Sequence, residues 1–438
     1  MDRRYHSWGR YPQTAQSAVV VHWRTLPLPI PRDSQRTFLP FGNGRSYGDV
    51  CLNSGGVLLD ARGLDRFISF DSAEGVLRCE SGVLLSEILA LTVPRGWFPP
   101  VVPGTRFVTI GGAIANDIHG KNHHSAGTFG CHVRCLELLR SDGQRLRCSP
   151  SENPEWFRAT VGGLGLTGLI LWAEIALKRI DNPMMEVETV RYGQLDDFFA
   201  LSMESDEKYE YTVAWVDSMA RGKHLGRGHF IRANHAAPGS TQLSAPRYQA
   251  SMAVDLPFSL VNRTSARIFN TVYYRKQVRK QSTGLTHYDP FFFPLDQLQH
   301  WNRLYGPRGF HQYQCLLPLS SAGRNALREI FNRGARGGIE CFLSVLMVFG
   351  THQSPGLLSF PRTGVSVTVD ICHRGERALR LLDDFDEVVR TAGGAVYPAK
   401  DARMSGASFR QYFPQYLELE PFRDPQFNSS FWRRLTGK

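Results

Sequence analysis

Residues 40–49 have the composition of a loop that holds an anionic ligand. They read Pro-Phe-Gly-Asn-Gly-Arg-Ser-Tyr-Gly-Asp, with glycines at positions 42, 44 and 48. Glycine lets a backbone turn sharply and approach a ligand closely, so that amide N–H groups can point at phosphate oxygens. Arg45 adds a permanent positive charge whose forked donors match those oxygens. The loop predicts a phosphate cradle, although a tight surface turn has the same composition.

Two further glycine-rich segments follow, at residues 103–112 and 162–168. A Rossmann dinucleotide site needs G-x-G-x-x-G between a strand and a helix. The first loop instead has the spacing G-x-G-x-x-x-G, and no helical pattern follows Gly48. The P-loop pattern G-x-x-x-x-G-K-[ST] does not occur in the chain. These spacings argue against a nicotinamide site and a P-loop, whereas three separate turns can converge on one extended dinucleotide.

A polar cluster occupies residues 116–124, which read Asn-Asp-Ile-His-Gly-Lys-Asn-His-His. On a helix, His119 and His123 would share a face, as a pair of metal ligands does. Glycine separates them, however, and no neighbouring carboxylate completes a catalytic zinc signature. We therefore expect no metal here and favour an active-site loop over a purely structural one. Such a loop offers donors that stabilise negative charge or orient a substrate hydroxyl.

The composition limits the classes of partner. A chain of 438 residues exceeds the usual size of a single hydrophobic core, so two domains are expected. The formal net charge of +11 favours anions: a nucleic acid, an acidic membrane face or a phosphorylated substrate. No long Lys/Arg block, zinc-finger spacing or RNP motif supports a nucleic acid.

Other features bear on location. No apolar segment of signal-peptide length follows the basic start, and no run of about 18 apolar residues occurs. We expect a cytoplasmic protein, or one that is peripheral at the inner membrane face. The eight cysteines lie in apolar or strand-like segments without CxxC pairs, which is typical of buried free thiols in a reducing compartment.

Short strands and helices must position these loops. In the first 180 residues we predict strands at 56–60, 67–70, 75–79 and 169–177, a hairpin at 136–148 with an Asp-Gly turn, and helices at 84–93 and 154–161. Further on we predict strands at 312–317, 341–349 and 365–372, and helices at 323–333 and 376–391. The order predicts an α+β fold rather than regular βαβ alternation.

The loop at 40–49 and the segment at 103–124 together resemble flavoenzymes of the vanillyl-alcohol-oxidase type, which have a PCMH-type FAD-binding domain. Further similar segments occur in the same order as in that family, so the resemblance spans nearly the whole chain. They are residues 162–170, Trp215, 301–314, 397–401 and 424–425. Within the family it is strongest to the enzymes that oxidise C2 of decaprenylphosphoryl-β-D-ribose. Those enzymes are the oxidising half of an epimerisation that makes the lipid-linked arabinose donor for cell-envelope glycans, including arabinan.

The resemblance implies a function and a domain plan. We expect FAD-dependent oxidation of a sugar hydroxyl; the alternatives are a soluble aldonolactone or alditol oxidase that uses oxygen, and a flavin-free basic binding protein. The FAD-binding domain, with two α/β subdomains, would occupy residues 1–180. An α+β substrate domain, an antiparallel sheet flanked by helices, would occupy 181–393. Residues 394–438 would return to the FAD-binding domain.

The resemblance also implies which residues hold FAD. Many relatives attach the flavin through a histidine in the first loop, where this chain has Tyr47, so non-covalent FAD is expected. The residues implied in FAD binding are Phe41, Gly42, Asn43, Gly44, Arg45, Ser46, Tyr47, Gly48, Asp49, Gly104, Thr109, Ile110, Gly111, Gly112, Asn116, Asp117, Ile118, His119, Ile170 and Tyr397.

On the substrate side, the resemblance implies a base or charge partner among His119, Lys121 and Lys400, and the choice among them stays open. Substrate contacts would come from Trp215, Phe292, Gln312, Gln314, Ser366 and Thr368.

Four positions depart from the arabinose-pathway enzyme: Thr368 replaces a cysteine, Ser366 an asparagine, Met347 a lysine and Phe292 a tyrosine. These departures leave the redox chemistry in place and put the sugar or lipid in doubt. The expected partners are a polyprenyl-phosphate sugar or a free sugar, a short-chain reductase and a peripheral membrane contact, with no nucleic acid.

Overall fold

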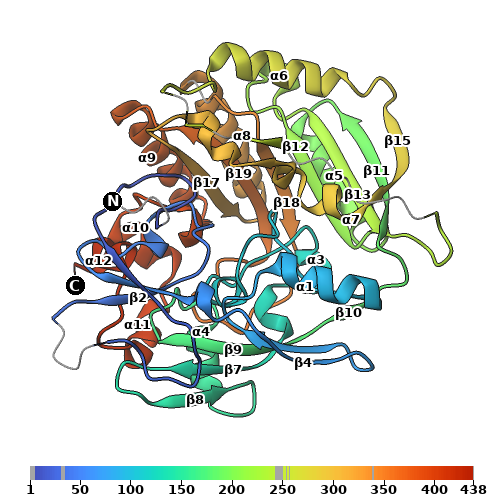
Figure 1. The fold of residues 1–438 in the computed structure, drawn as a ribbon. Helices are drawn as coiled ribbons and strands as arrows, with labels where there is room; N and C mark the ends of the chain where they lie inside the picture. Colours follow the sequence, from blue (N-terminus) through green and yellow to red (C-terminus); the bar gives the residue numbers. More distant parts are fainter. Residues whose placement is uncertain are drawn as a thin grey trace.

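The computed structural model describes residues 5–30, 35–241, 250–252, 254–255, 257–337 and 340–437. Its helices are combined with two large antiparallel sheets, one in the lower half of Figure 1 and one in the upper half. This combination confirms the predicted mixture of helices and antiparallel sheets. Among the described residues, no helix has the length and apolar character needed to cross a bilayer.

The first half of the chain forms a small parallel sheet and a five-stranded antiparallel one. Strands β1 (Ser17–Val20), β3 (Val57–Asp60) and β2 (Phe38–Phe41) make the parallel sheet, and β2 leads directly into the glycine loop at 42–48. The larger sheet has the order β4 (Phe67–Asp71), β5 (Val76–Glu80), β9 (Leu169–Ala176), β7 (Val133–Leu139) and β8 (Arg145–Cys148). This half of the chain also contains the helices α1 (Leu85–Thr92), α2 (Ile110–Ala115), α3 (His123–Ala126) and α4 (Pro154–Thr160). A separate short pair is formed by β6 (Trp97–Phe98) and β10 (Lys178–Arg179).

The hairpin between β7 and β8 has the Asp-Gly turn that the sequence predicts. Leu139 pairs with Arg145, so residues 140–144 form the connection. Gly143 of the Asp-Gly pair has a φ of 90° and lies near the end of that connection. The Arg140 N–H donates to the Gln144 carbonyl at 2.9 Å and the Gly143 N–H to the Arg140 carbonyl at 3.0 Å, so the hairpin closes in a tight turn that contains Asp142 and Gly143, as predicted. The Arg140 and Ser141 side chains point away from this turn and bind the C-terminal segment.

The second half forms an eight-stranded antiparallel sheet. Its order is β15 (Gln281–His287), β11 (Met184–Tyr192), β13 (Gly228–His235), β12 (Tyr211–Val216), β18 (Ser344–Phe349), β19 (Gly364–Cys372), β17 (Phe310–Leu317) and β20 (Ala395–Val396). The main helices are α5 (Leu195–Ser205), α6 (Arg263–Arg275), α8 (Ser321–Gly337) and α9 (Glu376–Thr391). Shorter elements are α7 (Tyr288–Phe292) and the pair β14 (Ala250–Ser251) and β16 (Leu298–Gln299).

The two faces of this sheet have different partners. Alternate side chains, such as Tyr313, Cys315 and Val367, join a hydrophobic core with α5, α8 and α9. The intervening side chains point to the opposite face, because successive residues of a strand alternate. That second face is also buried: all nine residues of β19 are buried. The face opposite α5, α8 and α9 is therefore turned toward the interior of the molecule.

The chain ends in the helices α10 (Gly406–Tyr412), α11 (Tyr416–Leu419) and α12 (Ser430–Thr436). Of these, α12 packs against residues 49–51, directly after the first glycine loop, and α10 packs against α12. Arg434 forms ion pairs with Asp49 and Asp401, both at 2.8 Å. The Asp424 carboxylate accepts hydrogen bonds from the backbone N–H and hydroxyl of Ser141. These contacts fix the glycine loop between distant parts of the sequence.

All eight cysteines are free thiols in the structure. Six are buried, Cys51 is half-buried and Cys131 is exposed.

Candidate active site

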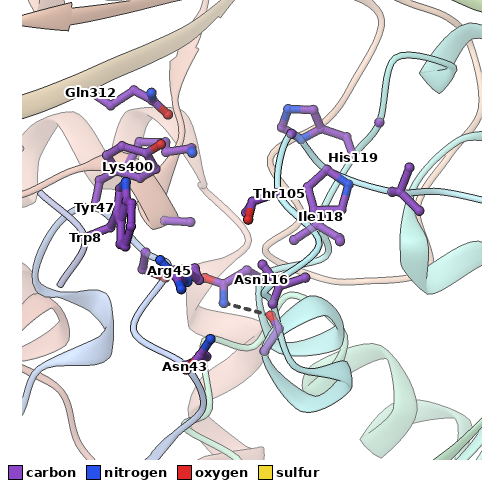
Figure 2. Close-up of a pocket in the computed structure, with 18 of the residues that line it drawn as sticks. Trp8, Asn43, Arg45, Tyr47, Thr105, Asn116, Ile118, His119, Gln312 and Lys400 are labelled. Atoms are coloured by element: carbon purple, nitrogen blue, oxygen red, sulfur yellow. Dashed lines mark hydrogen bonds between the residues drawn. The ribbon is translucent and has the colours of Figure 1, made fainter. Parts of the chain in front are cut away.

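A cavity of about 590 Å³ lies between the glycine loops and the face of the eight-stranded sheet opposite α5, α8 and α9. Loops of the first half supply polar groups on one side, and strands β11, β12, β13, β17 and β18 supply alternate side chains on the other. Figure 2 shows Tyr47 and Lys400 opposite His119, with Asn43 and Arg45 nearby.

The loop at 42–46 closes one end of the cavity. Asn43 donates a hydrogen bond to the Phe107 carbonyl at 2.8 Å, and the Arg45 guanidinium stacks over the Trp8 ring at 4.1 Å. A Cβ on Gly42 would lie 2.4 Å from Thr109 Oγ1, so only glycine allows the two loops this approach. Glycine is thus required where the loops meet.

Several polar atoms that line the cavity are buried without a partner in the described protein. They are Arg45 Nε, Ser81 Oγ, Asn116 Oδ1 and His119 Nδ1. Buried polar groups are almost always hydrogen-bonded in native proteins, because an unpaired one loses its interaction with water. Four such atoms along one cavity indicate a polar ligand that extends along it.

His119 lies at the boundary between the loops and the sheet. The Gln314 amide nitrogen donates to His119 Nε2 at 2.8 Å and to Ser366 Oγ at 3.0 Å. Burial, followed by the nearby His123 and Lys400, lowers the pKa of His119 to about 3, so the ring is neutral. With Nε2 accepting, the proton resides on Nδ1, which is free to donate to a ligand.

Lys400 lies on the opposite side. Its Nζ is 3.8 Å from the centre of the Tyr47 ring. Burial lowers the pKa of Lys400 to about 7, and the negative charge of Asp370 partly offsets that effect. Asp370 is fully buried, accepts from Gln312 at 2.7 Å and from the Tyr305 hydroxyl at 3.2 Å, and burial raises its pKa to about 6. The site thus contains an amine that can exchange a proton near neutral pH.

Lys121 has a different environment. Its Nζ donates to the Phe292 carbonyl at 2.9 Å and lies 5.6 Å from the centres of the Phe291 and Phe292 rings. Burial lowers the pKa of Lys121 to about 8, and Asp296 acts in the opposite direction. One donor of Lys121 is therefore already engaged by the protein.

The structure brings most of the sequence-predicted residues to this cavity. Its lining includes Phe41, Gly42, Asn43, Gly44, Arg45, Ser46, Tyr47, Gly104, Thr109, Gly111, Gly112, Asn116, Ile118, His119, Lys121, Ile170, Trp215, Phe292, Gln312, Gln314, Thr368, Tyr397 and Lys400.

Five predicted residues do not line it: Gly48, Asp49, Ile110, Asp117 and Ser366. Asp49 is paired with Arg434, and Asp117 accepts hydrogen bonds from two serine hydroxyls and the Gly130 N–H. Gly48 packs against the Asp401 backbone, which a Cβ would meet at 1.6 Å. Ile110 is fully buried in the hydrophobic core, and the Ser366 hydroxyl accepts a hydrogen bond from the Gln314 amide. These residues hold the lining residues in place.

Sequence reasoning missed several lining residues, among them Trp8, Ser81, Tyr273 and Asp296. Each is an isolated residue in an ordinary segment, so no motif singles it out. Trp8 is far from Arg45 along the chain, so no local signal could have suggested their stacking.

The far end of the cavity is mainly apolar. Its walls are alternate residues of the sheet and residues of α6, α7 and the loop before β18: Val187, Val213, Ile231, Tyr273, Phe291, Leu343, Val345 and Met347. Trp215 is held there by a hydrogen bond from its indole N–H to the Phe342 carbonyl at 2.9 Å. The cavity therefore has a polar end and an apolar end.

Comparison with known proteins agrees with this geometry. Residues 29–149 match the model of an FAD binding domain. The chain is 34% identical to decaprenylphosphoryl-beta-D-ribose oxidase of Mycolicibacterium smegmatis over 458 aligned positions, which cover 99% of this chain and 97% of the relative. The chain belongs to the decaprenylphosphoryl-beta-D-ribose oxidase family. It is thus an FAD-dependent oxidoreductase with a PCMH-type FAD-binding domain.

Two further relatives match different shares of this oxidase-family chain. An uncharacterized protein of Streptomyces coelicolor is 32% identical over 81% of this chain and 100% of its own length. A putative D-arabinono-1,4-lactone oxidase of Neurospora crassa is 29% identical over 34% of this chain and 26% of its own length.

The lining residues fit FAD. The glycines at 42, 44, 104, 111 and 112 leave the loop backbones accessible, and Arg45 faces the same end of the cavity. The unpartnered atoms of Arg45, Ser81 and Asn116 are suited to the polar groups of a dinucleotide. Among the described residues that line the cavity, His119 is the only histidine, and it is bound to Gln314.

Proposed function

We propose that this oxidoreductase oxidises C2 of a polyprenyl-phosphoryl-ribose, as the oxidising half of an epimerisation that yields an arabinose donor for cell-envelope glycans. The observation that carries the proposal is the similarity to decaprenylphosphoryl-beta-D-ribose oxidase over 99% of the chain. The cavity supports it, because its polar end suits a sugar phosphate beside FAD and its apolar end suits a polyprenyl chain. A short-chain reductase would act on the keto product.

Within this proposal, residues 1–180 form the FAD-binding domain, 181–393 the substrate domain and 394–438 the segment that returns to the first. FAD is held without a covalent bond, since the first glycine loop has Tyr47 at the place of an attaching histidine and burial raises the pKa of that phenol. Cys51 also lines the cavity, but burial raises the pKa of its thiol to about 12, so the thiolate that could attack a flavin is scarce.

Lys400 is the proposed base. When bound, FAD supplies the hydride acceptor for the carbinol C–H. The hydroxyl proton must leave at the same centre, and a base works best when its pKa lies near the working pH. Lys400, with a pKa of about 7, meets that condition, whereas His119, with a pKa of about 3, is too weak a base.

The other polar residues orient the sugar in this proposal. His119 Nδ1 donates to a sugar oxygen, and the Gln314 amide keeps that tautomer in place. Gln312, anchored by Asp370, presents its amide oxygen to a second hydroxyl. Lys121 lies on the cavity wall near Asp296 and adds positive charge for the substrate phosphate.

Anaerobic reduction of the bound flavin tests this function. The FAD-loaded protein is mixed without oxygen with polyprenyl-phosphoryl-ribose, free ribose, arabinono-1,4-lactone and an alditol, and the flavin absorbance is followed. We expect fast bleaching with the lipid-linked sugar and little with the others.

Bleaching by the free lactone or alditol, with hydrogen peroxide formed in air, would instead establish the soluble oxidase. The Neurospora relative supports that alternative over only a third of the chain.

A further inference from the structure

Exposed apolar side chains are concentrated in one segment. Among the described residues, seven of the fifteen large hydrophobic side chains that are exposed lie within residues 254–278 of the 438-residue chain. Isolated exposed hydrophobic residues are normal, whereas a contiguous group marks an interaction surface. The seven are Val254, Phe258, Leu260, Ile268, Phe269, Val272 and Val278.

Helix α6 forms the centre of this group. Ala266 and Asn270 face inward, and the Asn270 amide donates to Asp217 Oδ1 and to the Cys341 carbonyl, both at 3.1 Å. On the outward side, Ile268 and Val272 lie one helical turn apart and are 60% and 62% exposed. The helix is thus firmly attached on one side and presents an apolar ridge on the other.

The segment that carries the ridge is strongly basic. Six exposed basic residues occur between 263 and 280, and none forms an ion pair with a described residue. No Asp or Glu occurs anywhere in residues 257–288. The basic residues are Arg263, Arg267, Arg275, Lys276, Arg279 and Lys280. An apolar ridge among unpaired cations is the pattern of a helix that lies in the interface of an anionic bilayer.

The same helix borders the apolar end of the cavity. Tyr273 of α6 lines the cavity, where its ring lies 4.6 Å from that of Trp215. Phe269 stacks on Tyr273 at 5.6 Å and is 43% exposed on the surface. A continuous series of aromatic side chains therefore joins the cavity to the exposed ridge. In Figure 1, α6 lies at the top of the molecule, far from the five-stranded sheet.

We propose that the described residues between 254 and 280, with α6 at their centre, bind the surface of an anionic phospholipid bilayer. The Ile268–Val272 ridge enters the interface while the cations of this segment contact lipid phosphates. This contact places the apolar end of the cavity beside the acyl chains, which is where a lipid-linked sugar is held. The reason for docking rests on the proposed function, but the docking itself does not require turnover.

Vesicle sedimentation of the FAD-loaded protein tests the proposal. Vesicles of phosphatidylglycerol and phosphatidylcholine in equal parts are compared with vesicles of phosphatidylcholine alone. We expect binding to the anionic vesicles that weakens when salt is raised from about 0.1 M to about 1 M, because the ions screen the charges.

Two surface variants and a matched control locate the contact. Ile268→Asp with Val272→Asp removes the ridge, and Arg267→Gln with Arg275→Gln removes two cations; each should weaken vesicle binding about tenfold or more. Leu417→Asp on α11, where the side chain is 63% exposed, should bind as the unaltered protein does. None of the five positions lines the cavity, so flavin content should be unchanged in all three.

Equal binding by the ridge variant and the unaltered protein would overturn the proposal, as would equal binding to both vesicle types or no vesicle binding. Binding of a single-stranded polynucleotide without vesicle binding would also overturn it. A protein that binds anionic vesicles through this surface but oxidises no lipid-linked sugar would leave the docking surface established and the proposed function wrong.

Discussion

Lys400 has the environment of a proton acceptor that works near neutral pH. Its ammonium is destabilised by burial and stabilised by the Asp370 carboxylate, and the balance leaves its pKa at about 7. A buried lysine without that carboxylate would lose its proton at a lower pH, and one in water would keep it. The pair therefore sets the pH at which the proposed oxidation can proceed.

Replacing Lys400 with methionine should slow anaerobic flavin reduction about 100-fold or more, because a positioned base contributes roughly that factor. Methionine preserves much of the side-chain volume, so FAD content and melting temperature should stay close to those of the unaltered protein. Stopped-flow absorbance with the lipid-linked sugar measures the rate. A variant that reduces FAD at the normal rate would assign the base elsewhere.

Flavin reduction should accelerate as pH rises through about 7, since the neutral amine of Lys400 is the active form. Asp370→Asn removes the charge that raises the lysine pKa, so the midpoint of this rise should move to lower pH. The pH profiles of the two proteins provide the comparison. An unchanged midpoint, or one at higher pH, would show that Asp370 does not act on the titrating group.

The sequence predicted the residue types of the site better than their contacts. Arg45, His119 and Lys400 belong to recognisable segments, and all three line the cavity. The bond between Gln314 and His119 joins residues 195 positions apart, so no local pattern could indicate it. The role of Asp370 near Lys400 could not be predicted, because an aspartate in an alternating strand normally faces solvent.

At the scale of elements, the sequence indicates which side chains of a strand share a face, but not what covers that face. Strand β19 alternates Ser366, Thr368 and Asp370 with valines, which indicates one polar face. In the structure that polar face is turned toward the cavity, so the whole strand is buried. Alternation reports which side chains share a face, and only the tertiary fold decides whether water or a ligand covers it.

Non-covalent retention of FAD is testable through the first glycine loop. Tyr47 packs edge-on against Phe310 at 5.6 Å, and burial raises the pKa of its phenol, so the nucleophilic phenolate is scarce. Acid precipitation should release all of the flavin into the supernatant. Flavin fluorescence that remains with the precipitated chain on a denaturing gel would contradict this.

The C-terminal helix α12 should contribute measurably to stability through one side chain. Arg434 pairs with two buried carboxylates, Asp49 and Asp401. Arg434→Ala would leave Asp49 without its cation and Asp401 with Arg403 alone, which we expect to lower the free energy of unfolding by about 3 kcal/mol. Urea unfolding measures the change.

Arg410→Ala on the neighbouring helix α10 is the matched control, because Arg410 is exposed. It should change the unfolding free energy by less than about 0.5 kcal/mol. Equal effects of the two substitutions would show that the buried ion pairs of Arg434 contribute nothing to the free energy of unfolding.

At the scale of the whole molecule, the site exists only because the two large sheets face each other. Glycine loops from the first half and strands from the second half meet at the cavity, and residues 395–437 link both. The α+β class and most strand positions could be predicted, since they depend on local pattern. The packing of the glycine loops against a sheet face could not be predicted, because it depends on contacts between residues hundreds of positions apart.

The departures at Phe292, Met347 and Thr368 all lie along the substrate side of the cavity. They leave the loops that approach FAD unaltered. The oxidation itself should therefore persist, while the choice of sugar position and lipid depends on these side chains.

The most direct test of the proposed reaction is a kinetic isotope effect on flavin reduction. Polyprenyl-phosphoryl-ribose is prepared with deuterium at C2 or at C3, and the anaerobic bleaching rate of each is compared with that of the unlabelled sugar. We expect a several-fold slower rate for the C2-deuterated substrate alone, since that C–H bond breaks as hydride leaves. A normal rate with the C2 label and a slow one with the C3 label, or no bleaching by any of the three, would contradict it.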